Sequence, residues 1–390
     1  MPVTPPRGMR DLLPAEKEAR ESVLSVIRDT YQSRGFQEIE TPALEELARL
    51  TSGQGGENEK LVFKVQKRGE DFERALEAGE ELADLGLRFD LTVPLTRYFA
   101  SNQAKLPRVL KAIQIGPVWR AERPQKGRYR QFLQCDIDIV GDATELAELE
   151  LISASLAALD AIGLSGATIR INDRRLLTGT MAELGLQDHL DKALIAIDKL
   201  DKIGVDGVVA ELQALVGQEA SQAARGWLEA APSAAMPEIL AWTAQLGPLA
   251  KRLRFDPTLV RGMGYYTGAI FEIEHPEVSY SIGGGGRYDE MVGRWAGTDT
   301  PAVGISLGIE RILDLISGPG PKENSLVLLV LDDASGALKS QSDLIAQGWR
   351  VRLERQAKNT KAQLAELAAA GFSHFAFFEE GGQLDIKPLS

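Results

Sequence analysis

The chain has 390 residues, of which 44% are hydrophobic and 26% charged, a composition typical of globular proteins large enough for two or three domains. Its formal net charge of −12 argues against a surface of uniformly positive potential for non-specific nucleic-acid binding, although a local basic cleft is compatible with that sum. With a single cysteine and three histidines far apart in sequence, an internal disulfide is excluded, and a His/Cys metal cluster or a Ser/His nucleophile pair is a poor hypothesis.

The sequence shows no targeting or membrane-spanning pattern. The N-terminal segment lacks the basic-then-apolar run of a signal peptide. No stretch approaches the roughly 20 uninterrupted apolar residues that a membrane span requires. Together with the single cysteine, Cys135, these features predict a protein of the reducing cytoplasm that does not contact a membrane.

The first part of the chain predicts a long helix followed by a strand. A helical repeat of apolar residues begins after Pro14 and ends at Gly35, where a left-handed cap is expected. Alternating residues then predict a strand over 36–40. Residues 57–85 are charged and irregular, which indicates a hairpin or loop on the surface.

The middle of the chain contains strands and then a long helical block. Strands are predicted around 113–120, 131–140 and 168–172, with an alanine- and leucine-rich helix at about 144–162. From about 173 to 254, Ala, Leu, Glu and Gln dominate and nearly every residue fits a helix. Because strand-rich regions lie on both sides of this block, it is predicted to be an insertion into a sheet domain.

Strands return after the helical block, at 260–274 and 278–283, and an apolar segment over 301–307 leads into a helix at 309–316. Residues 318–321, Gly-Pro-Gly-Pro, form the strongest linker signal in the chain. The alternating β and α patterns beyond it predict a small α/β domain. The predicted domains are a core in two parts (1–172 and 255–317), a helical insertion (173–254) and a C-terminal α/β domain (322–390).

The segment with the most chemistry is 116–138, two predicted strands joined by a loop rich in Arg, Lys, Pro and Gly. Guanidinium groups make bidentate bonds to phosphate oxygens, and carboxylates and amides suit a substrate that carries an amine. At a period of two, Gln134 and Asp138 share one face of their strand, whereas Asp136 is assigned to solvent or to the other face. The alternative for the whole segment is a solvated charged hairpin.

Three later segments add polar groups next to tight glycines. Residues 259–268 place Arg261 beside two tyrosines, of which Tyr265 is assigned to the core. The glycine run at 283–286 lets backbone approach a neighbour closely, and its structural alternative is a bulge or sharp turn. Arg311 is predicted in the first turn of a helix after a strand of small residues, although an isolated helical arginine normally lies on the surface.

Over about residues 5–316, the chain resembles the histidyl-tRNA synthetases. Segments 259–272 and 281–291 resemble two histidine-specific signatures, which are much more restrictive than the general class II motifs. Residues 35–42, 116–141 and 301–316 resemble the three general class II motifs. The resemblance implies an α+β fold, namely a class II synthetase-type antiparallel sheet flanked by helices, with a helical insertion and a small C-terminal α/β domain. It also implies a symmetric homodimer.

The resemblance further implies that histidine is activated with ATP, which arrives with Mg²⁺, and is then transferred to tRNA(His). The catalytic residues carried across by position are Arg261 and Arg120. The implied ATP-binding residues are Arg120, Glu122, Arg128, Phe132 and Arg311. The implied histidine-binding residues are Asp90, Thr92, Gln134, Asp138, Arg261, Tyr266 and Tyr288. For Asp90, a structural alternative is a cap on a helix that begins near Val93.

Two departures from the family keep other functions open. Gly264 stands where the family usually has an acidic residue, and residues 324–390 hold 7 basic against 8 acidic side chains. The second departure predicts weak or narrowly focused RNA contact, so an enzyme that activates histidine for another acceptor is one alternative. The other is a non-catalytic regulatory subunit of ATP phosphoribosyltransferase in histidine biosynthesis, which the retained phosphate-binding arginines disfavour.

Overall fold

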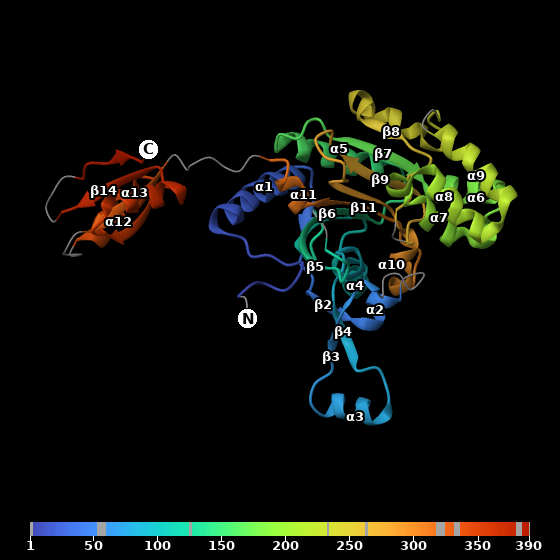
Figure 1. Cartoon of the computed structure of the whole chain (residues 1–390), viewed down its shortest axis with the longest axis horizontal. Helices are drawn as coiled ribbons and strands as arrows, with labels where there is room; N and C mark the ends of the chain where they lie inside the picture. Colours follow the sequence, from blue (N-terminus) through green and yellow to red (C-terminus); the bar gives the residue numbers. More distant parts are fainter. Residues whose placement is uncertain are drawn as a thin grey trace. The chain divides into compact units, whose positions relative to one another are not determined.

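The computed structural model describes residues 3–52, 60–124, 127–231, 234–261, 264–316, 324–330, 336–379 and 384–389. The chain divides into two compact units, one of residues 1–11 and 23–316 and one of residues 12–22 and 317–390 (Figure 1). The predicted linker at 318–321 lies outside the described residues. The domain boundaries inferred from the sequence remain predictions.

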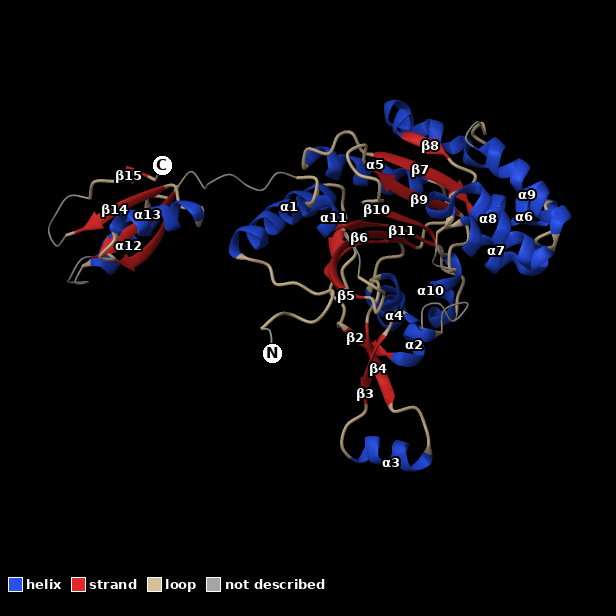
Figure 2. Ribbon diagram, in the orientation of Figure 1, coloured by secondary structure: helices blue, strands red, loops and turns tan. Residues whose placement is uncertain are grey.

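An eight-stranded sheet forms the centre of the larger unit (Figure 2). In spatial order its strands are β1 (Gln37–Glu38), β5 (Leu110–Trp119), β6 (Gln131–Val140), β11 (Ala302–Gly308), β10 (Gly283–Arg287), β9 (Ala269–Glu274), β7 (Thr168–Asp173) and β8 (Leu253–Phe255). Only the outermost pairs, β1 with β5 and β7 with β8, are parallel. The expected α+β fold with a largely antiparallel sheet flanked by helices is confirmed.

Three helices cover one face of this sheet, and they are α1 (Pro14–Gln32), α5 (Leu146–Ala161) and α11 (Ile309–Leu313). Ile27 of α1, Leu151 of α5 and Ile137 of β6 belong to one apolar core and are fully buried. Burial of each such side chain contributes about 1.5–3 kcal/mol relative to exposure. With this face closed by apolar packing, polar residues of the same strands are directed to the other face.

A smaller three-stranded sheet is formed by residues between 44 and 87. Its order is β2 (Leu44–Glu46), β4 (Ala83–Leu87) and β3 (Phe63–Gln66). The short helices in this region are α2 (Leu47–Thr51), α3 (Glu70–Ala78), α4 (Thr92–Asn102) and the 3₁₀ turn η2 (Gln103–Lys105). From residue 60 onward, the segment predicted as an irregular surface hairpin is therefore two paired strands that enclose a helix.

The segment between β7 and β8 is helical in all of its described elements, as its composition predicts. These are α6 (Arg174–Glu183), η3 (Gln187–His189), α7 (Leu190–Ile197), α8 (Leu200–Val216), α9 (Gln218–Ala230) and the 3₁₀ segment η5 (Glu238–Arg252). Helices α6 to α9 gather beside the sheet around buried residues that include Leu194, Leu212 and Leu228 (Figure 1).

Two predicted strands are wrong. The strand expected over 260–274 begins only at Ala269, and the one expected over 278–283 is replaced by β10, the glycine run itself. A Cβ atom added to Gly284 would lie 2.6 Å from the carbonyl oxygen of Phe271 on β9. The glycines therefore form an inner strand between closely spaced neighbours, not the bulge or sharp turn considered from the sequence.

The smaller unit has a four-stranded sheet in the order β13 (Arg350–Arg355), β12 (Ser325–Val330), β14 (His374–Phe378) and β15 (Lys387–Pro388). Its helices are α12 (Ala337–Ala346) and α13 (Thr360–Ala369). β12 pairs in parallel with both neighbours and is buried along its length, as expected for a strand covered on both faces. The predicted α/β pattern is confirmed.

Among the helices of the described residues, none is both long enough and apolar enough to cross a bilayer.

Helix α10 (Asp289–Ala296) completes the larger unit and packs beside α4. It follows the glycine strand directly, so its first residues stand at the end of β10. The N-terminal ends of α4, α10 and α11 all lie beside residues of the uncovered sheet face, where the polar side chains gather.

Candidate active site

A cleft of about 1070 Å³ opens on the uncovered face of the main sheet. The twelve residues singled out above all line it, although they come from separate parts of the chain. They are Asp90, Thr92, Arg120, Glu122, Arg128, Phe132, Gln134, Asp138, Arg261, Tyr266, Tyr288 and Arg311. The structure therefore brings every proposed site residue together, while the role of each stays a prediction.

Strand β6 supplies the floor of the cleft because its side chains alternate between the two faces of the sheet. Cys135 and Ile137 are buried in the apolar core, whereas Gln134, Asp136 and Asp138 line the cleft. The assignment of Asp136 to solvent or to the other face is therefore wrong. Residues 134, 136 and 138 are in phase, so the same period of two that selected its neighbours would have found Asp136.

The floor holds an unusual set of buried acceptors. Asp90, Gln134, Asp136 and Asp138 are each at most 7% exposed. Each has one side-chain oxygen with no hydrogen-bond donor among the described residues. A buried acceptor without a donor costs about 1–3 kcal/mol, so this group is suited to a small ligand with several N–H donors.

Burial changes the acidity of these carboxyl groups. It raises the pKa of Asp90 to about 6, although the Val93 N–H and the charge of Arg120 act in the opposite direction. It raises the pKa of Asp138 to about 7, although the Tyr288 hydroxyl donates to Asp138 Oδ1 at 2.5 Å. For Asp136, burial and the nearby Asp138 carboxylate raise the pKa well above its ordinary value. A bound cation would favour the ionised form of all three.

Asp90 has a structural contact as well as a free oxygen. The backbone N–H of Val93, in the first turn of α4, donates to Asp90 Oδ1 at 3.0 Å. The capping alternative for Asp90 is therefore observed. It uses one oxygen only, because Oδ2 has no donor among the described residues and the side chain lines the cleft.

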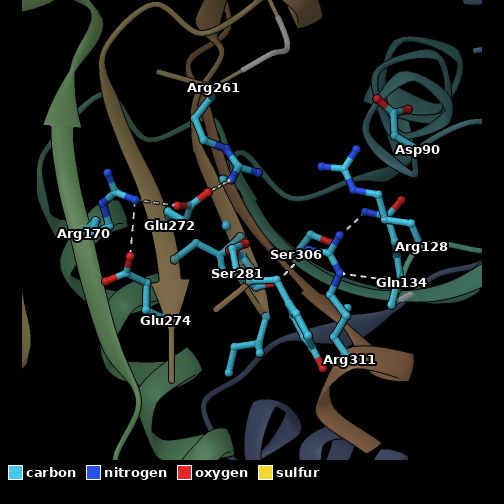
Figure 3. A pocket seen from close by; sticks show the side chains of 18 of the residues that line it. Asp90, Arg128, Gln134, Arg170, Arg261, Glu272, Glu274, Ser281, Ser306 and Arg311 are labelled. Carbon is cyan, nitrogen blue, oxygen red and sulfur yellow. Dashed lines mark hydrogen bonds and ion pairs between the residues drawn. The ribbon is translucent and has the colours of Figure 1, made fainter. Parts of the chain in front are cut away.

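Four arginines stand around another part of the cleft: Arg120, Arg128, Arg261 and Arg311. Figure 3 shows Arg261 on one side and Arg128 and Arg311 on the other. Burial lowers the pKa of Arg311, and the positive charges of the other three arginines lower it further. Clustered guanidinium groups that repel one another are suited to a ligand with several negative charges.

Backbone carbonyl groups hold two of these arginines in place. Arg120 Nε donates to the carbonyl oxygen of Phe89 at 3.0 Å. Arg311 Nη1 donates to the carbonyl oxygen of Ser281 at 2.6 Å, and its Nε donates to that of Gly127 at 3.2 Å. Because a neutral carbonyl removes little of the positive charge, these contacts orient the guanidinium groups and leave them attractive to anions.

An aromatic ring lies next to the arginines. The guanidinium carbon of Arg120 is 5.1 Å from the centre of the Phe132 ring. Arg128 Nη1 donates to Glu122 Oε2 at 3.4 Å at the edge of the same region. An aromatic ring next to a guanidinium group is suited to a flat heterocyclic base.

Arg261 makes an ion pair with a residue that was not singled out from the sequence. Its Nη1 lies 3.0 Å from Glu272 Oε2. Gly264, which replaces the family's usual acidic residue, is exposed and does not line the cleft. Tyr265 is buried as predicted, but it also lines the cleft, with its ring centre 4.8 Å from that of Tyr266.

The glycine strand leaves room for the catalytic candidates. A Cβ atom at Gly284 would lie 2.7 Å from Arg261 Nη1, and one at Gly286 would lie 2.8 Å from a ring carbon of Tyr266. Both positions must therefore lack a side chain for those two residues to keep their places. The next residue, Arg287, has a structural role, since its Nε and Nη2 each donate to Glu148 at 2.6 Å.

Known proteins resemble this chain along its whole length. A protein-family model described as Histidyl-tRNA synthetase matches residues 8–312. A protein of Leifsonia xyli subsp. xyli named histidine--tRNA ligase is 53% identical, with 100% of this chain and 99% of that protein aligned. The crystal structure of histidyl-tRNA synthetase from Nostoc sp. PCC 7120 has a TM-score of 0.75 and 25% identity, and covers 100% of this chain and 97% of that one.

A fourth similarity concerns the fold alone. The crystal structure of an ATP phosphoribosyltransferase regulatory subunit/histidyl-tRNA synthetase from Bacillus halodurans C has a TM-score of 0.72 at 21% identity. It covers 94% of this chain and 97% of that one. Since the same architecture occurs under both descriptions, the side chains of the cleft must carry the functional argument.

Proposed function

The chain belongs to the histidyl-tRNA synthetase family, and from this premise we infer that it is a histidine–tRNA ligase. In the first step, histidine and ATP form histidyl-adenylate and pyrophosphate. In the second step, the histidyl group passes to tRNA(His) and AMP is released. The observation that carries this proposal is the meeting of four arginines with four buried acceptors in one cleft.

The arginines are suited to the phosphate chemistry of the first step. A carboxylate oxygen of histidine attacks the α-phosphorus of ATP, and the bond to the β-phosphate oxygen breaks. The attacking carboxylate is already ionised, so no general base is needed. Arg261 and Arg120 stabilise the negative charge that develops on the α-phosphate, each by a few kcal/mol.

The remaining contacts to ATP come from the other side of the cleft. Arg128 binds the terminal phosphates, and Arg311 reaches the γ-phosphate while packing on one face of the adenine. Phe132 stacks on the opposite face of the base. Glu122 contacts the adenine edge.

The buried acceptors are suited to histidine. Its ammonium group has three N–H donors for Asp90 and Gln134, with Thr92 beside them. Asp138 and Tyr266 bracket the two ring nitrogens, and the Tyr288 hydroxyl holds Asp138 from the other side. A side chain without ring nitrogens would leave these buried groups unpaired, which disfavours it strongly.

Mg²⁺ enters this scheme with ATP. Within the described ranges, no group of three or more His, Cys, Asp or Glu side chains is arranged to hold a metal ion. Mg²⁺ needs few protein ligands when phosphate oxygens bind it, so we assign it to the nucleotide and give it no separate step. The tRNA contact through the C-terminal domain, the homodimer and the cytoplasmic location are further parts of the proposal.

ATP–pyrophosphate exchange with each amino acid in turn tests the first step. We expect exchange with histidine and not with the other amino acids. Absence of exchange with every amino acid would contradict the proposal and favour a regulatory function. Charging of total tRNA with labelled histidine tests the second step, and exchange without charging would point to an acceptor other than tRNA.

A further inference from the structure

A chain of three charged side chains connects the wall of the cleft to Arg261. We propose that Glu272 is a positioning residue for Arg261, and that Arg170 and Asp256 hold Glu272 in the orientation this requires. The inference rests on the proposed function, because it concerns how the catalytic arginine is oriented. Glu272 and Arg170 both line the cleft, and neither was singled out from the sequence.

The sheet brings the members of this chain together. Strand β9 pairs with β7 in antiparallel register, and Arg170 stands directly opposite Glu272. Phe271 and Ile273 are buried in the apolar core, so the alternating residues Glu272 and Glu274 face the cleft. Cross-strand neighbours of opposite charge on one face of a sheet stabilise each other.

Glu272 connects two arginines through its two oxygens. Its Oε1 accepts a hydrogen bond from Arg170 Nη1 at 3.1 Å, and its Oε2 accepts one from Arg261 Nη1 at 3.0 Å (Figure 3). Arg170 and Arg261 therefore hold the carboxylate from opposite sides. The bond to Arg261 occupies one terminal nitrogen, which leaves further guanidinium donors for a phosphate.

Arg170 also anchors the backbone that carries Arg261. Its Nε donates to Asp256 Oδ2 at 2.8 Å, and Asp256 Oδ1 accepts from the N–H and the hydroxyl of Thr258 at 2.9 and 2.7 Å. Asp256 and Thr258 begin the segment that leads to Arg261. Arg170 therefore contacts the segment that leads to Arg261 through Asp256, and it contacts the side chain of Arg261 through Glu272.

The carboxylates around Arg170 keep this arginine ionised and in place. Arg170 lies within 3.3 Å of carboxylate oxygens of four residues, which are Asp201, Asp256, Glu272 and Glu274. Although burial acts to lower the pKa of Arg170, these carboxylates raise it on balance. Glu272 Oε1 is therefore held by a charged arginine, while its Oε2 contacts Arg261.

A long arginine side chain needs such a contact because it has many rotamers. Holding it in one of them has an entropic cost, which a preorganised site has already met before the substrate arrives. The backbone of Gly284 restricts the same guanidinium from another side, since a Cβ there would meet it. A displacement of about 1 Å at a catalytic group can cost about 100-fold in rate.

The test compares Glu272→Ala with a matched control, Glu274→Ala. Glu274 lies on the same strand and face and pairs with Arg170 and Arg254 at 3.3 and 3.1 Å, but its ion pairs do not include Arg261. We expect Glu272→Ala to lower kcat of histidine-dependent ATP–pyrophosphate exchange about 10- to 100-fold, with KM for ATP within about threefold. The control should lose less than about threefold. Should Glu272→Ala not fold, the isosteric Glu272→Gln takes its place, with a loss between those two.

A double-mutant cycle separates positioning from general stability. In an Arg261→Ala background, Glu272→Ala should cause no further loss, because the residue it orients is gone. Equal losses from Glu272→Ala and Glu274→Ala would overturn the inference, and so would losses that multiply in the double variant. Absence of exchange in the unsubstituted chain would instead overturn the proposed function, on which the inference depends.

Discussion

The cleft contains two sets of side chains that are built in opposite ways, an acidic set (Asp90, Asp136 and Asp138) and a basic set (Arg120, Arg128, Arg261 and Arg311). The carboxyl groups of the acidic set are buried, and each has an oxygen without a donor among the described residues. In the basic set, Arg120, Arg261 and Arg311 are half-buried and Arg128 is exposed, and backbone carbonyls orient Arg120 and Arg311. Under the proposed function, we expect the acidic set to select the amino acid through the cost of unpaired buried groups, and the basic set to determine the rate through orientation.

The largest loss of activity should come from substitution in the basic set. Arg261→Ala is expected to lower exchange by about 100- to 1000-fold, because it removes a charge aimed at the α-phosphate in the transition state. ATP affinity and the unfolding midpoint should change little, and the exposed Arg294→Ala serves as a control away from the cleft. Steady-state exchange kinetics measure the loss. Undiminished exchange in Arg261→Ala would remove the catalytic role assigned to it.

Substitution in the acidic set should have a smaller effect, which is confined to the kinetic constants for histidine. Asp138→Asn is isosteric but loses the charge and an acceptor facing the imidazole, so kcat/KM for histidine should fall about 10- to 100-fold. KM for ATP in the same variant is an internal control and should stay within about threefold. If KM for histidine and KM for ATP rose together, the acidic and basic sets would not act separately on the two substrates.

Asp136 should contribute less, since the roles that the family resemblance implies leave it without a direct partner on histidine. We nevertheless expect Asp136→Asn to raise KM for histidine about 3- to 10-fold, because its buried oxygen without a donor faces the same cleft. An unchanged KM for histidine, with folding intact by circular dichroism, would show that Asp136 serves the sheet alone.

The weakest effect concerns pH and the free protein. The pKa of Asp138 is about 7 in the folded chain and about 3.9 when unfolded. Between these values the folded state binds more protons, so this group stabilises the fold at low pH and loses that contribution as pH rises through 7. When the pH is lowered from 8 to 6, the unfolding midpoint of the ligand-free chain should therefore rise relative to that of Asp138→Asn. Parallel curves for the two proteins would contradict the raised pKa.

Histidine affinity should show the opposite trend. Protonation of Asp90, with a pKa of about 6, and of Asp138 removes the acceptors that the ammonium and imidazole groups need. KM for histidine should thus rise as pH falls from 8 to 6, and Asp138→Asn should flatten the upper part of that rise.

Much of this molecule follows from local patterns. Strand β6 has the bounds that alternation and the flanking loop predict, Gln131–Val140, and the helical character of the segment between β7 and β8 follows from its composition. The twelve site residues were found because two restrictive signatures resemble those of a known family, and all of them line one cleft. These features are visible in one sequence because each depends on residues that are close neighbours along the chain.

Tertiary structure alone decided the rest. The glycine strand has no side-chain alternation to predict it, and its glycines are needed because backbone carbonyls of the neighbouring strands, together with Arg261 and Tyr266, occupy the space a Cβ would take. Likewise, no local pattern pairs Glu272 with Arg170, 102 residues away. The local sequence predicted most of the strands and helices and the polar face of many of them. Which polar groups meet depended on sheet register, because contacts between remote segments are set by the packing of the whole sheet.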